Sequence, residues 1–352
     1  MRRQLNSKYG ATGKSDETCR RFVLQVHVTS ACDSNCVHCY QRGIAATHMM
    51  MQDFRLLMQQ FGDLLDALEQ ERGFRPEPLV TITGGEPLMH PMFKELVFCA
   101  WLRGFEVAVL TNGHLMDEAT AAFLRDARFV QVSLDGNEPV HDSMRGKGDF
   151  ARVLTAIRLL KKAGANPIVS FTAHEGNFRT LPEAARAARK AGANRFWSDR
   201  YLPLDEGCSL NPLDADQVAE YLSLLSRSSK KRGSVVVCHR ALQSLCGGEP
   251  YRCHAARDIL AVDEACRVMP CRRLPQYCGD FRQTPLHDLY WHDPTFVELR
   301  AFSFPDECTA CEHASACGGG LRCMSAAALG DWHRADPGCP LVGALDSLRR
   351  AL

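Results

Sequence analysis

The stretch Thr29–Tyr40, TSACDSNCVHCY, places Cys32, Cys36 and Cys39 on one short loop. The run before it, FVLQVHV at Phe22–Val28, is short and mainly apolar and therefore favours a β-strand. Three thiolates on a short loop can bind three irons of a four-iron cluster and leave the fourth iron open to another ligand. This loop therefore predicts a metal or cluster site at the end of the first strand.

A closed zinc site is the alternative for these three thiols. Zinc in a structural site takes four protein ligands, so a fourth residue is needed. His38 and His48 are near enough in the sequence to supply it. The triplet alone is compatible with an iron–sulfur cluster and with a zinc site, and the surrounding sequence has to distinguish between the two.

From Arg21 as far as residue 200, short apolar runs alternate with longer amphipathic segments. The runs expected as strands are Phe22–Val28, Leu79–Thr83, Glu106–Thr111, Phe129–Leu134, Pro167–Ala173 and Arg195–Arg200. The segments expected as helices between them are Gln52–Glu71, Met92–Arg103, Phe150–Ala163 and Leu181–Ala191. This alternation is typical of βα units with right-handed crossovers, and it predicts an α/β fold with a partial, TIM-like (βα)6 barrel. Functional residues in such barrels gather on the loops that follow the strands.

Beyond residue 200 the alternation stops after one more expected helix, Ala215–Lys231, and cysteines accumulate. Eleven of the 17 cysteines fall between Cys238 and Cys339. A segment so rich in Cys, Gly and Pro is expected to use metal ligation in place of a conventional apolar core. We therefore expect three regions, with an N-terminal tail at 1–20, a barrel at 21–232 and a cysteine-rich domain at 233–352.

Composition argues against several kinds of partner. The formal net charge of +1 gives no electrostatic footprint for nucleic acid. No run of about 18 apolar residues occurs, and residues 1–20 lack the apolar core of a signal peptide. These features predict a cytoplasmic protein that acts on a peptide or a small molecule, without a membrane partner. Disulfides are a poor explanation for 17 cysteines in such a protein, which favours metal ligation.

The Cys-x3-Cys-x2-Cys loop after the first strand resembles the defining motif of the radical S-adenosylmethionine superfamily. Two further loops, TGGEP at Thr83–Pro87 and SLDG at Ser133–Gly136, resemble that family's cosubstrate contacts. The run HDSMRGKGDF follows SLDG, and TAHEGN ends in Asn177, where relatives often carry asparagine. Each motif alone is only a turn or a strand end, but their order after successive strands gives the resemblance its weight.

The resemblance implies a [4Fe-4S] cluster on Cys32, Cys36 and Cys39 that binds S-adenosylmethionine at its open iron. One electron passed to the sulfonium would release methionine and a 5'-deoxyadenosyl radical, which abstracts hydrogen from an unactivated C–H bond. The residues implied to contact the cosubstrate are Tyr40, Gly84, Gly85, Glu86, Pro87, Ser133, Asp135, Arg145 and Asn177. Arg145 would pair with the cosubstrate's carboxylate, although a solvated surface position explains that arginine as well.

The cysteine-rich region resembles the SPASM extension of the same superfamily, which carries one or two auxiliary four-iron clusters. The resemblance is carried by Cys308-x2-Cys311-x5-Cys317-x5-Cys323, by Cys339, and by Cys253 and Cys271 upstream. Two features depart from the SPASM pattern. Five residues rather than the usual three separate Cys317 from Cys323, and Cys266 replaces an expected glycine.

The SPASM pattern of interleaved ligation implies two auxiliary sets. The second auxiliary set is Cys308, Cys311, Cys317 and Cys339. The first auxiliary set is Cys253, Cys271 and Cys323, with a fourth ligand at Cys266, Cys246 or Cys278, or with an iron left open for substrate. A four-cysteine zinc site is the alternative for the dense group. Plain thiols are expected at Cys19, Cys99 and Cys208.

SPASM-type enzymes mostly modify peptides or proteins, so a peptide is the expected substrate, with auxiliary clusters as the exit for a further electron. A small molecule is the alternative within the superfamily, and a non-catalytic metal-binding adaptor is the alternative outside it. Retention of GGEP counts against the adaptor. Arg272 stands where sulfatase maturases carry a candidate aspartate base, which counts against that activity.

The resemblance also implies partners and substrate contacts. Flavodoxin or ferredoxin would supply the electron. Because only about 20 residues precede the first strand, a peptide leader would need a separate leader-binding protein or another surface of this chain. Asp199, Arg200 and Tyr201, at the end of the sixth strand, are expected to face the barrel mouth and to contact or deprotonate the substrate. A loop salt bridge explains the Asp199–Arg200 pair as well.

Overall fold

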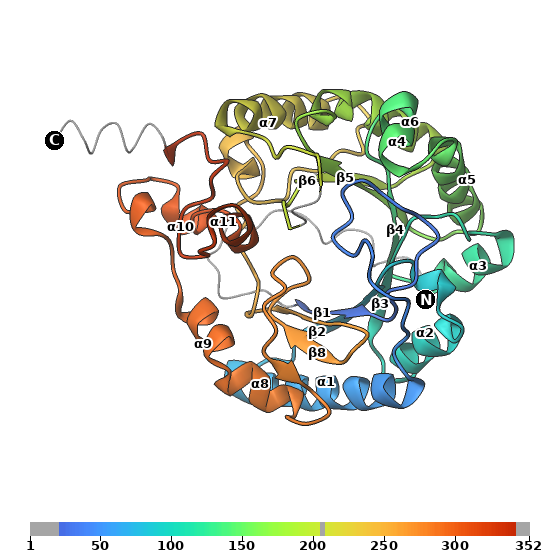
Figure 1. Ribbon diagram of the computed structural model, residues 1–352, viewed down its shortest axis with the longest axis vertical. Coiled ribbons are helices and arrows are strands. Elements are labelled where there is room, and N and C mark those ends of the chain that lie inside the picture. The colour runs from blue at the N-terminus through green and yellow to red at the C-terminus, as the bar shows by residue number, and fades with distance from the viewer. Residues whose placement is uncertain (1–20, 205–207, 343–352) are drawn as a thin grey trace.

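A wall of six parallel strands forms the frame of the molecule (Figure 1). The computed structural model describes residues 21–204 and 208–342, so the expected tail at 1–20 lies outside the described residues. The strands are β1 Arg21–His27, β2 Glu77–Thr83, β3 Glu106–Thr111, β4 Phe129–Ser133, β5 Pro167–Ala173 and β6 Arg195–Arg200. Each coincides with a strand that the sequence predicts, and the partial (βα)6 barrel is confirmed.

Helices cover the outer face of this wall (Figure 1). They are α1 Met51–Arg72, α2 Phe93–Leu102, α3 Glu118–Phe123, α4 Glu138–Arg145, α5 Asp149–Lys162, α6 Leu181–Ala191 and α7 Ala215–Ser229. The five expected helices correspond to α1, α2, α5, α6 and α7, whereas α3 and α4 are too short for periodicity to reveal. Short 3-10 turns lie at Pro87–Met89, Leu124–Asp126, Phe178–Thr180, Gln243–Cys246 and Asp306–Cys308.

Strand β1 joins the barrel to the cysteine-rich region. It pairs in parallel with β2 at one edge and with β7, Ile259–Val262, at the other. Strands β8, Arg267–Met269, and β9, Gly279–Asp280, extend the sheet in antiparallel fashion. The nine-stranded sheet, in the order β6-β5-β4-β3-β2-β1-β7-β8-β9, therefore crosses the boundary expected near residue 233.

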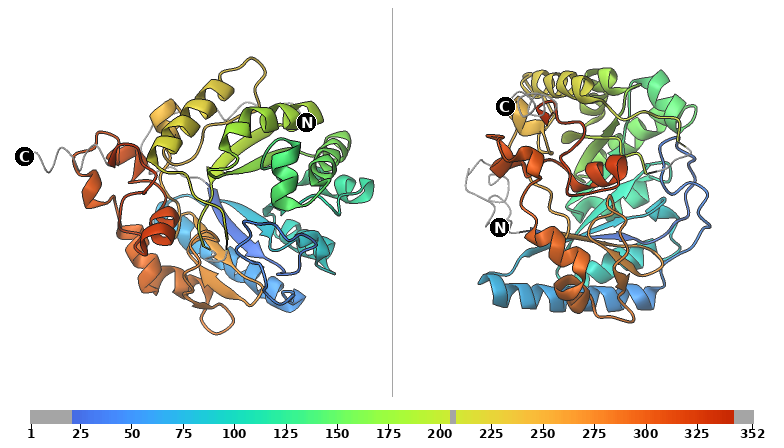
Figure 2. Two further views of the ribbon diagram at one scale, coloured as in Figure 1. Left: turned by 45° about the horizontal axis from the view of Figure 1, so that its top comes forward. Right: turned by 60° about the vertical axis from the view of Figure 1, so that its left-hand side comes forward.

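The remaining helices complete the ring around the sheet (Figures 1 and 2). They are α8 Leu286–His292, α9 Pro294–Ala301, α10 Ala314–Cys317 and α11 Arg322–Leu329. In Figure 1 they occupy the arc between α7 and α1, which the barrel strands leave open.

One hydrophobic core runs through both regions. Phe22 of β1 contacts Phe61 of α1 and Tyr290 of α8, with ring centroids 5.9 and 5.7 Å apart, and all three rings are buried. Buried aromatic rings contribute strongly to core stability. The expectation that metal ligation replaces an apolar core after residue 233 is therefore wrong for the segment that includes β7, β8 and α8.

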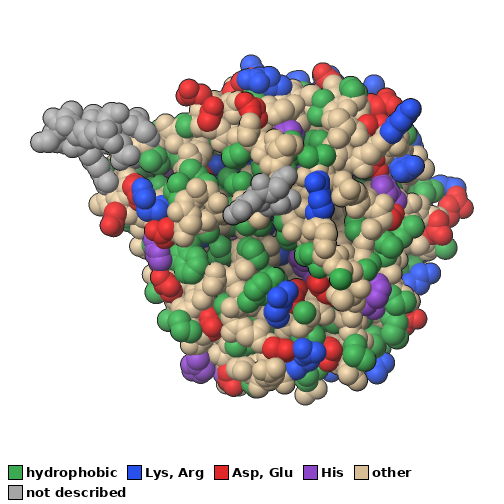
Figure 3. Space-filling model, viewed as in Figure 1, with side chains coloured by type: hydrophobic (Ala, Val, Ile, Leu, Met, Phe, Trp, Pro, Cys, Tyr) green, Lys and Arg blue, Asp and Glu red, His purple; other side chains and the backbone are tan. Residues whose placement is uncertain are grey.

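The surface shows no dominant charge on the face seen in Figure 3, where acidic and basic side chains are interspersed. This mixture agrees with the net charge of +1. Within 21–204 and 208–342, none of the helices combines the length and apolar character that a membrane crossing requires.

A buried ion pair fixes the C-terminal segment to the barrel. Arg200 of β6 donates from Nη1 to Oδ1 of Asp336 at 2.8 Å, and both side chains are almost fully buried. The same carboxylate accepts hydrogen bonds from the backbone of Leu321 and Gly338. One aspartate thus joins three segments of the chain.

We predict that Asp336→Ala lowers the free energy of unfolding by about 3–5 kcal/mol, because it leaves the Arg200 charge buried without a counter-charge. The urea midpoint of the anaerobic protein measures the change. The double variant Arg200→Met/Asp336→Leu is the control and should recover part of the loss, since it removes the buried charge but still leaves the Leu321 and Gly338 N–H groups without an acceptor. A loss below about 1 kcal/mol in the single variant would contradict the prediction.

Candidate functional site

The cysteine loop, residues 29–40, is held by the loop that follows β2. The backbone N–H groups of Gly85 and Glu86 donate to the carbonyl oxygens of Thr29 and Ala31, both at 2.8 Å. A Cβ atom at Gly84 or Gly85 would overlap those same carbonyl groups. The glycines therefore let the chain pack against its own cysteine loop, whereas the sequence indicated close approach to a ligand.

The three thiols of the cysteine loop influence one another. Desolvation raises the pKa of Cys32 to about 11, and the charge of Cys36 adds to the effect. Burial raises the pKa of Cys36, the Arg145 guanidinium opposes it, and Cys39 raises it further. The structure thus brings the triplet together, and a cationic metal centre would offset the repulsion between its thiolates.

Arg145, at the end of α4, lies behind the cysteine loop. Its Nε donates to Oδ2 of Asp135 at 2.6 Å, and its Nη1 donates to the Cys36 sulfur at 3.6 Å. Its side chain is 9% exposed, so the alternative of a solvated surface arginine is wrong. Although burial opposes it, the Arg145 charge lowers the pKa of Asp135 to about 2. The pair of Arg145 and Asp135 holds the SLDG loop against the cysteine loop.

Asn177, in the loop that follows β5, supports the SLDG loop. Its Nδ2 donates to the carbonyl oxygens of Asp135 at 2.9 Å and Thr172 at 2.8 Å, and its Oδ1 accepts from His174 N. The side chain is 1% exposed. Asn177 therefore ties the loops after β4 and β5 together. The other predicted cosubstrate contacts in this area are the half-buried Ser133, the buried Pro87 and the partly exposed Tyr40.

Sequence analysis missed the loop after β3. Asn112 Nδ2 donates to Asp33 Oδ1 at 2.6 Å and to Ser34 Oγ at 3.0 Å, inside the cysteine loop. The imidazole of His114 contacts both Asp33 and Asp149, the first residue of α5. The available signal was TNGH, which follows the third strand as TGGEP follows the second.

The C-terminal cysteines form two groups. Burial raises the pKa of Cys323 to about 12, and the charges of Cys253 and Cys271 add to it against the Arg273 guanidinium. Burial raises the pKa of Cys308 to about 11, with further contributions from Cys339, Cys311 and Cys317. These groups coincide with the first and second auxiliary sets implied by the SPASM pattern.

The candidate fourth ligands of the first auxiliary set have other surroundings. Cys266 is 1% exposed at a left-handed φ of 70° between β7 and β8, and burial raises its pKa to about 12, with Arg282 and nearby carboxylates as the other influences. The Cys246 thiol interacts with Cys238, and Cys278 with Asp293. The strongest influences on these three thiols come from groups other than Cys253, Cys271 and Cys323.

The expected plain thiols differ in their surroundings. Cys208 donates from Sγ to the carbonyl oxygen of Val37, in the cysteine loop, at 3.2 Å. Cys99 is half-buried in α2, and Cys19 lies outside the described residues.

The expected substrate contacts at the end of β6 are engaged within the chain. Asp199 contacts the Arg273 guanidinium and lies 3.7 Å from Nε of Arg240. Arg200 is buried against Asp336, and Tyr201 is 3% exposed. Arg200 therefore does not face the barrel mouth as the sequence indicated, because its carboxylate partner comes from the C-terminal segment.

Three comparisons with known proteins bear on this site. The model of the radical SAM superfamily matches residues 26–175. Mycofactocin maturase of Mycobacterium ulcerans is 30% identical over 321 residues, which cover 87% of this chain and 83% of that protein. AdoMet-dependent heme synthase of Methanosarcina barkeri (strain Fusaro) is 26% identical over 349 residues, or 90% of this chain and 95% of that protein.

This chain belongs to the radical SAM superfamily. A solved structure of anSMEcpe with bound AdoMet and a peptide shares the fold over 94% of this chain and 99% of that chain, with a TM-score of 0.72 at 16% identity. The likeness extends through the cysteine-rich region, so the SPASM-type architecture is shared. Membership implies an enzyme with a [4Fe-4S] cluster and S-adenosylmethionine, and the SPASM relatives suggest auxiliary clusters.

The donor atoms of this radical SAM enzyme fit such clusters. Each of the three groups offers thiols, the ligands that iron–sulfur clusters use. In the part of the chain that the structure describes, no three His, Cys, Asp or Glu side chains are arranged to hold a single metal ion. In a cluster each thiolate binds a different iron, so its thiols lie farther apart than those around one ion.

Glu86 of the TGGEP loop points into the fold. Its carboxylate is fully buried and accepts hydrogen bonds from Thr111 Oγ1 at 2.8 Å and Asn112 N at 2.7 Å. Burial raises the pKa of Glu86 to about 7, against these hydrogen bonds. The side chain thus connects the loops after β2 and β3.

We predict that Glu86 makes the fold less stable as pH rises from about 4.5 towards 8. The folded state binds the proton more tightly than the unfolded chain, so this contribution is complete below the unfolded pKa and is lost through the folded pKa. Glu86→Gln should remove about 2 kcal/mol of this dependence between pH 5.5 and 8, measured as urea midpoints at the two pH values. Glu95→Gln, at an exposed position, is the control. Equal slopes for Glu86→Gln and wild type would refute the prediction.

Proposed function

We propose that this radical SAM enzyme oxidatively modifies a peptide by abstracting a hydrogen atom with a 5'-deoxyadenosyl radical. The observation that carries the proposal is the convergence of ten cysteines into three thiol groups within one continuous fold. The triplet on residues 32–39 would hold the radical cluster, and the two auxiliary sets would hold clusters that accept an electron from the substrate. Reduced flavodoxin or ferredoxin would supply the initiating electron.

The chain's own residues orient and shield this chemistry. When bound, the cluster and S-adenosylmethionine would supply the radical at the end of β1. Asp135 holds Arg145 in place, and Arg145 in turn donates a hydrogen bond to the Cys36 sulfur. Such hydrogen bonds fix the orientation of a cluster ligand and adjust its potential. Tyr40 would contact the cosubstrate, and the backbone at Gly85 braces the loop from the other side.

Two buried polar groups near the cysteine loop and Cys271 are candidates for substrate contact. His27 Nε2 and Arg272 Nε are buried and have no hydrogen-bond partner among the described residues. Burial, aided by the Arg272 charge, lowers the pKa of His27 to about 3, so its imidazole is neutral near pH 7. Arg272 also interacts with Tyr40, next to Cys39. Buried polar groups need partners, and a substrate bound here would supply them.

A peptide is favoured over a small molecule by what the relatives do. Mycofactocin maturase and PqqA peptide cyclase are named for peptide products or substrates, and SuiB and anSMEcpe have been solved with peptides bound. The AdoMet-dependent heme synthase favours a second candidate, the modification of a tetrapyrrole or other small molecule. A short peptide encoded next to this chain's gene is the first substrate to test, with a porphyrin as the competing arm.

The cluster assignment predicts about twelve irons per chain in the anaerobically reconstituted enzyme and about eight in a Cys32→Ala/Cys36→Ala/Cys39→Ala variant, because each four-iron cluster contributes four. Iron and sulfide analysis measures the content. EPR of the reduced protein should show a signal that S-adenosylmethionine perturbs in wild type and that is absent from the variant. Zinc in place of iron, or cosubstrate cleavage retained in the variant, would overturn the proposal.

Arg272 is expected to act on substrate rather than on cosubstrate. We predict that Arg272→Gln raises KM for the peptide at least about tenfold, because a charge-assisted hydrogen bond is lost, while 5'-deoxyadenosine formation without peptide stays near wild type. Product analysis by mass spectrometry and chromatography measures both. Arg152→Gln, at an exposed position of α5, is the control. A loss of uncoupled cleavage equal to the loss of peptide turnover would place Arg272 at the cosubstrate instead.

A further inference from the structure

The spacer between Cys317 and Cys323, residues 318–322, is tightly fixed. Gly318, Gly319 and Gly320 have φ values of 64°, 77° and 86°, a left-handed run that glycine alone adopts readily. A Cβ atom at Gly319 would overlap the Pro305 ring, and one at Gly320 would overlap Asp336. The two residues by which this spacer exceeds the usual SPASM length are therefore part of a built structure.

Arg322, the last residue of the spacer, folds back onto it. Its guanidinium donates to four backbone carbonyl oxygens, those of Gly318, Gly319, Trp332 and Arg334, at 2.6–3.3 Å. The residue is 4% exposed, and the guanidinium carbon lies 5.1 Å from the centre of the Phe302 ring. Its position is thus determined from several sides.

Among the described residues, Arg322 has no carboxylate at ion-pair distance, although the charge of Asp336 still acts on it. No Asp or Glu of residues 21–204 and 208–342 forms an ion pair with it, and Asp336 is already engaged by Arg200. Other buried arginines differ, since Arg145 pairs with Asp135 and Arg273 with Asp199. A fully buried cation that contacts only carbonyl oxygens leaves its field to act on other charges nearby.

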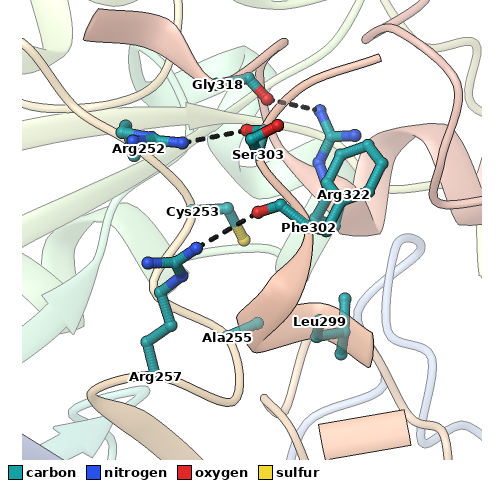
Figure 4. A pocket seen from close by; sticks show the side chains of 9 residues that line it. All are labelled: Arg252, Cys253, Ala255, Arg257, Leu299, Phe302, Ser303, Gly318 and Arg322. Carbon is teal, nitrogen blue, oxygen red and sulfur yellow. Dashed lines mark hydrogen bonds between the residues drawn. The ribbon is translucent and has the colours of Figure 1, made fainter. Parts of the chain in front are cut away.

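Arg322 lies between the two auxiliary sets. In the chain it directly precedes Cys323, a member of the first set. It also lines a cavity of about 20 Å³ together with Cys253, another member of that set (Figure 4). Its Nη2 donates a hydrogen bond to the carbonyl oxygen of Gly318, which follows Cys317 of the second set in the chain. Thiols of both sets are therefore within reach of one guanidinium.

We infer that Arg322 is a shared positive charge that raises the reduction potentials of both auxiliary clusters and so favours electron transfer away from the substrate radical. The inference rests on the two auxiliary clusters of the proposed function. A reduced cluster carries one more negative charge than an oxidised one, so a fixed cation in a low-dielectric interior stabilises the reduced form. In the reaction, the substrate radical loses one electron and one proton. The proton passes to solvent water, an oxidised auxiliary cluster gains the electron, and oxidised flavodoxin or ferredoxin removes the electron from the cluster.

The test is a potentiometric titration of the holoenzyme with dithionite, followed by EPR. In Arg322→Gln, the ratio of reduced to oxidised auxiliary cluster at a fixed solution potential should fall about tenfold, because a unit charge is removed at short range. The radical cluster on Cys32, Cys36 and Cys39 should keep its ratio and serves as an internal control. Arg322→Lys should stay near wild type because lysine keeps the charge. Since lysine cannot reproduce the four carbonyl contacts, this variant separates the effect of the charge from the effect of those contacts.

Arg257→Gln is the matched control, because Arg257 lines the same cavity and also donates to backbone carbonyl groups. Its auxiliary ratio should change less than that of Arg322→Gln. No change in Arg322→Gln, an equal change in all three clusters, or a fall in Arg322→Lys as large as in Arg322→Gln would overturn the inference. If Arg322→Gln loses auxiliary iron, the result for Arg322→Lys decides the question. Iron content and reduced-to-oxidised ratios equal to wild type in Arg322→Lys support the charge role, and a loss of either refutes it. A wild-type enzyme with only about four irons would refute the auxiliary clusters themselves, independently of Arg322.

Discussion

The double pairing of β1 is the constraint on which the rest of the structure depends. Backbone hydrogen bonds fix β1 to β2 over seven residue pairs and to β7 over four. The cysteine loop leaves the end of β1, and Cys271 follows the strand that is paired with β7. Because strands pair only in discrete registers, main-chain geometry positions the cysteine loop and the first auxiliary set relative to each other. The side chains between them, such as Gln25, then adjust contacts rather than create the arrangement.

Much of the barrel could be predicted from the sequence because its signals are local. The six strands and the five longer helices each carry enough residues for their periodicity to be seen, and the triplet spacing is contained in eight residues. Strand β7, ILAV, is only four residues long, and its partner lies more than 230 positions upstream. No local pattern could have predicted that pairing, so the cysteine-rich region looked more separate in sequence than it is.

The errors in the site have the same origin. Arg200 was expected at the mouth because it ends a strand, but Asp336, 136 positions later, holds it inside. Glu86 and Asn177 were assigned to the cosubstrate by motif, and the structure shows that both also brace neighbouring loops. A motif states which residues occur together. It does not state which of them face the ligand and which support those that do.

The continuity of the sheet has a consequence for how the protein can be divided. A barrel fragment that ended before β7 would expose the edge of β1, a strand whose Phe22, Leu24 and Val26 are completely buried. Exposed apolar edges of this kind recruit other strands and aggregate. The barrel and the cysteine-rich region are therefore not interchangeable modules that recombination could exchange freely. They share one edge, and a new C-terminal region could replace the present one only if it supplied a strand in the register of β7.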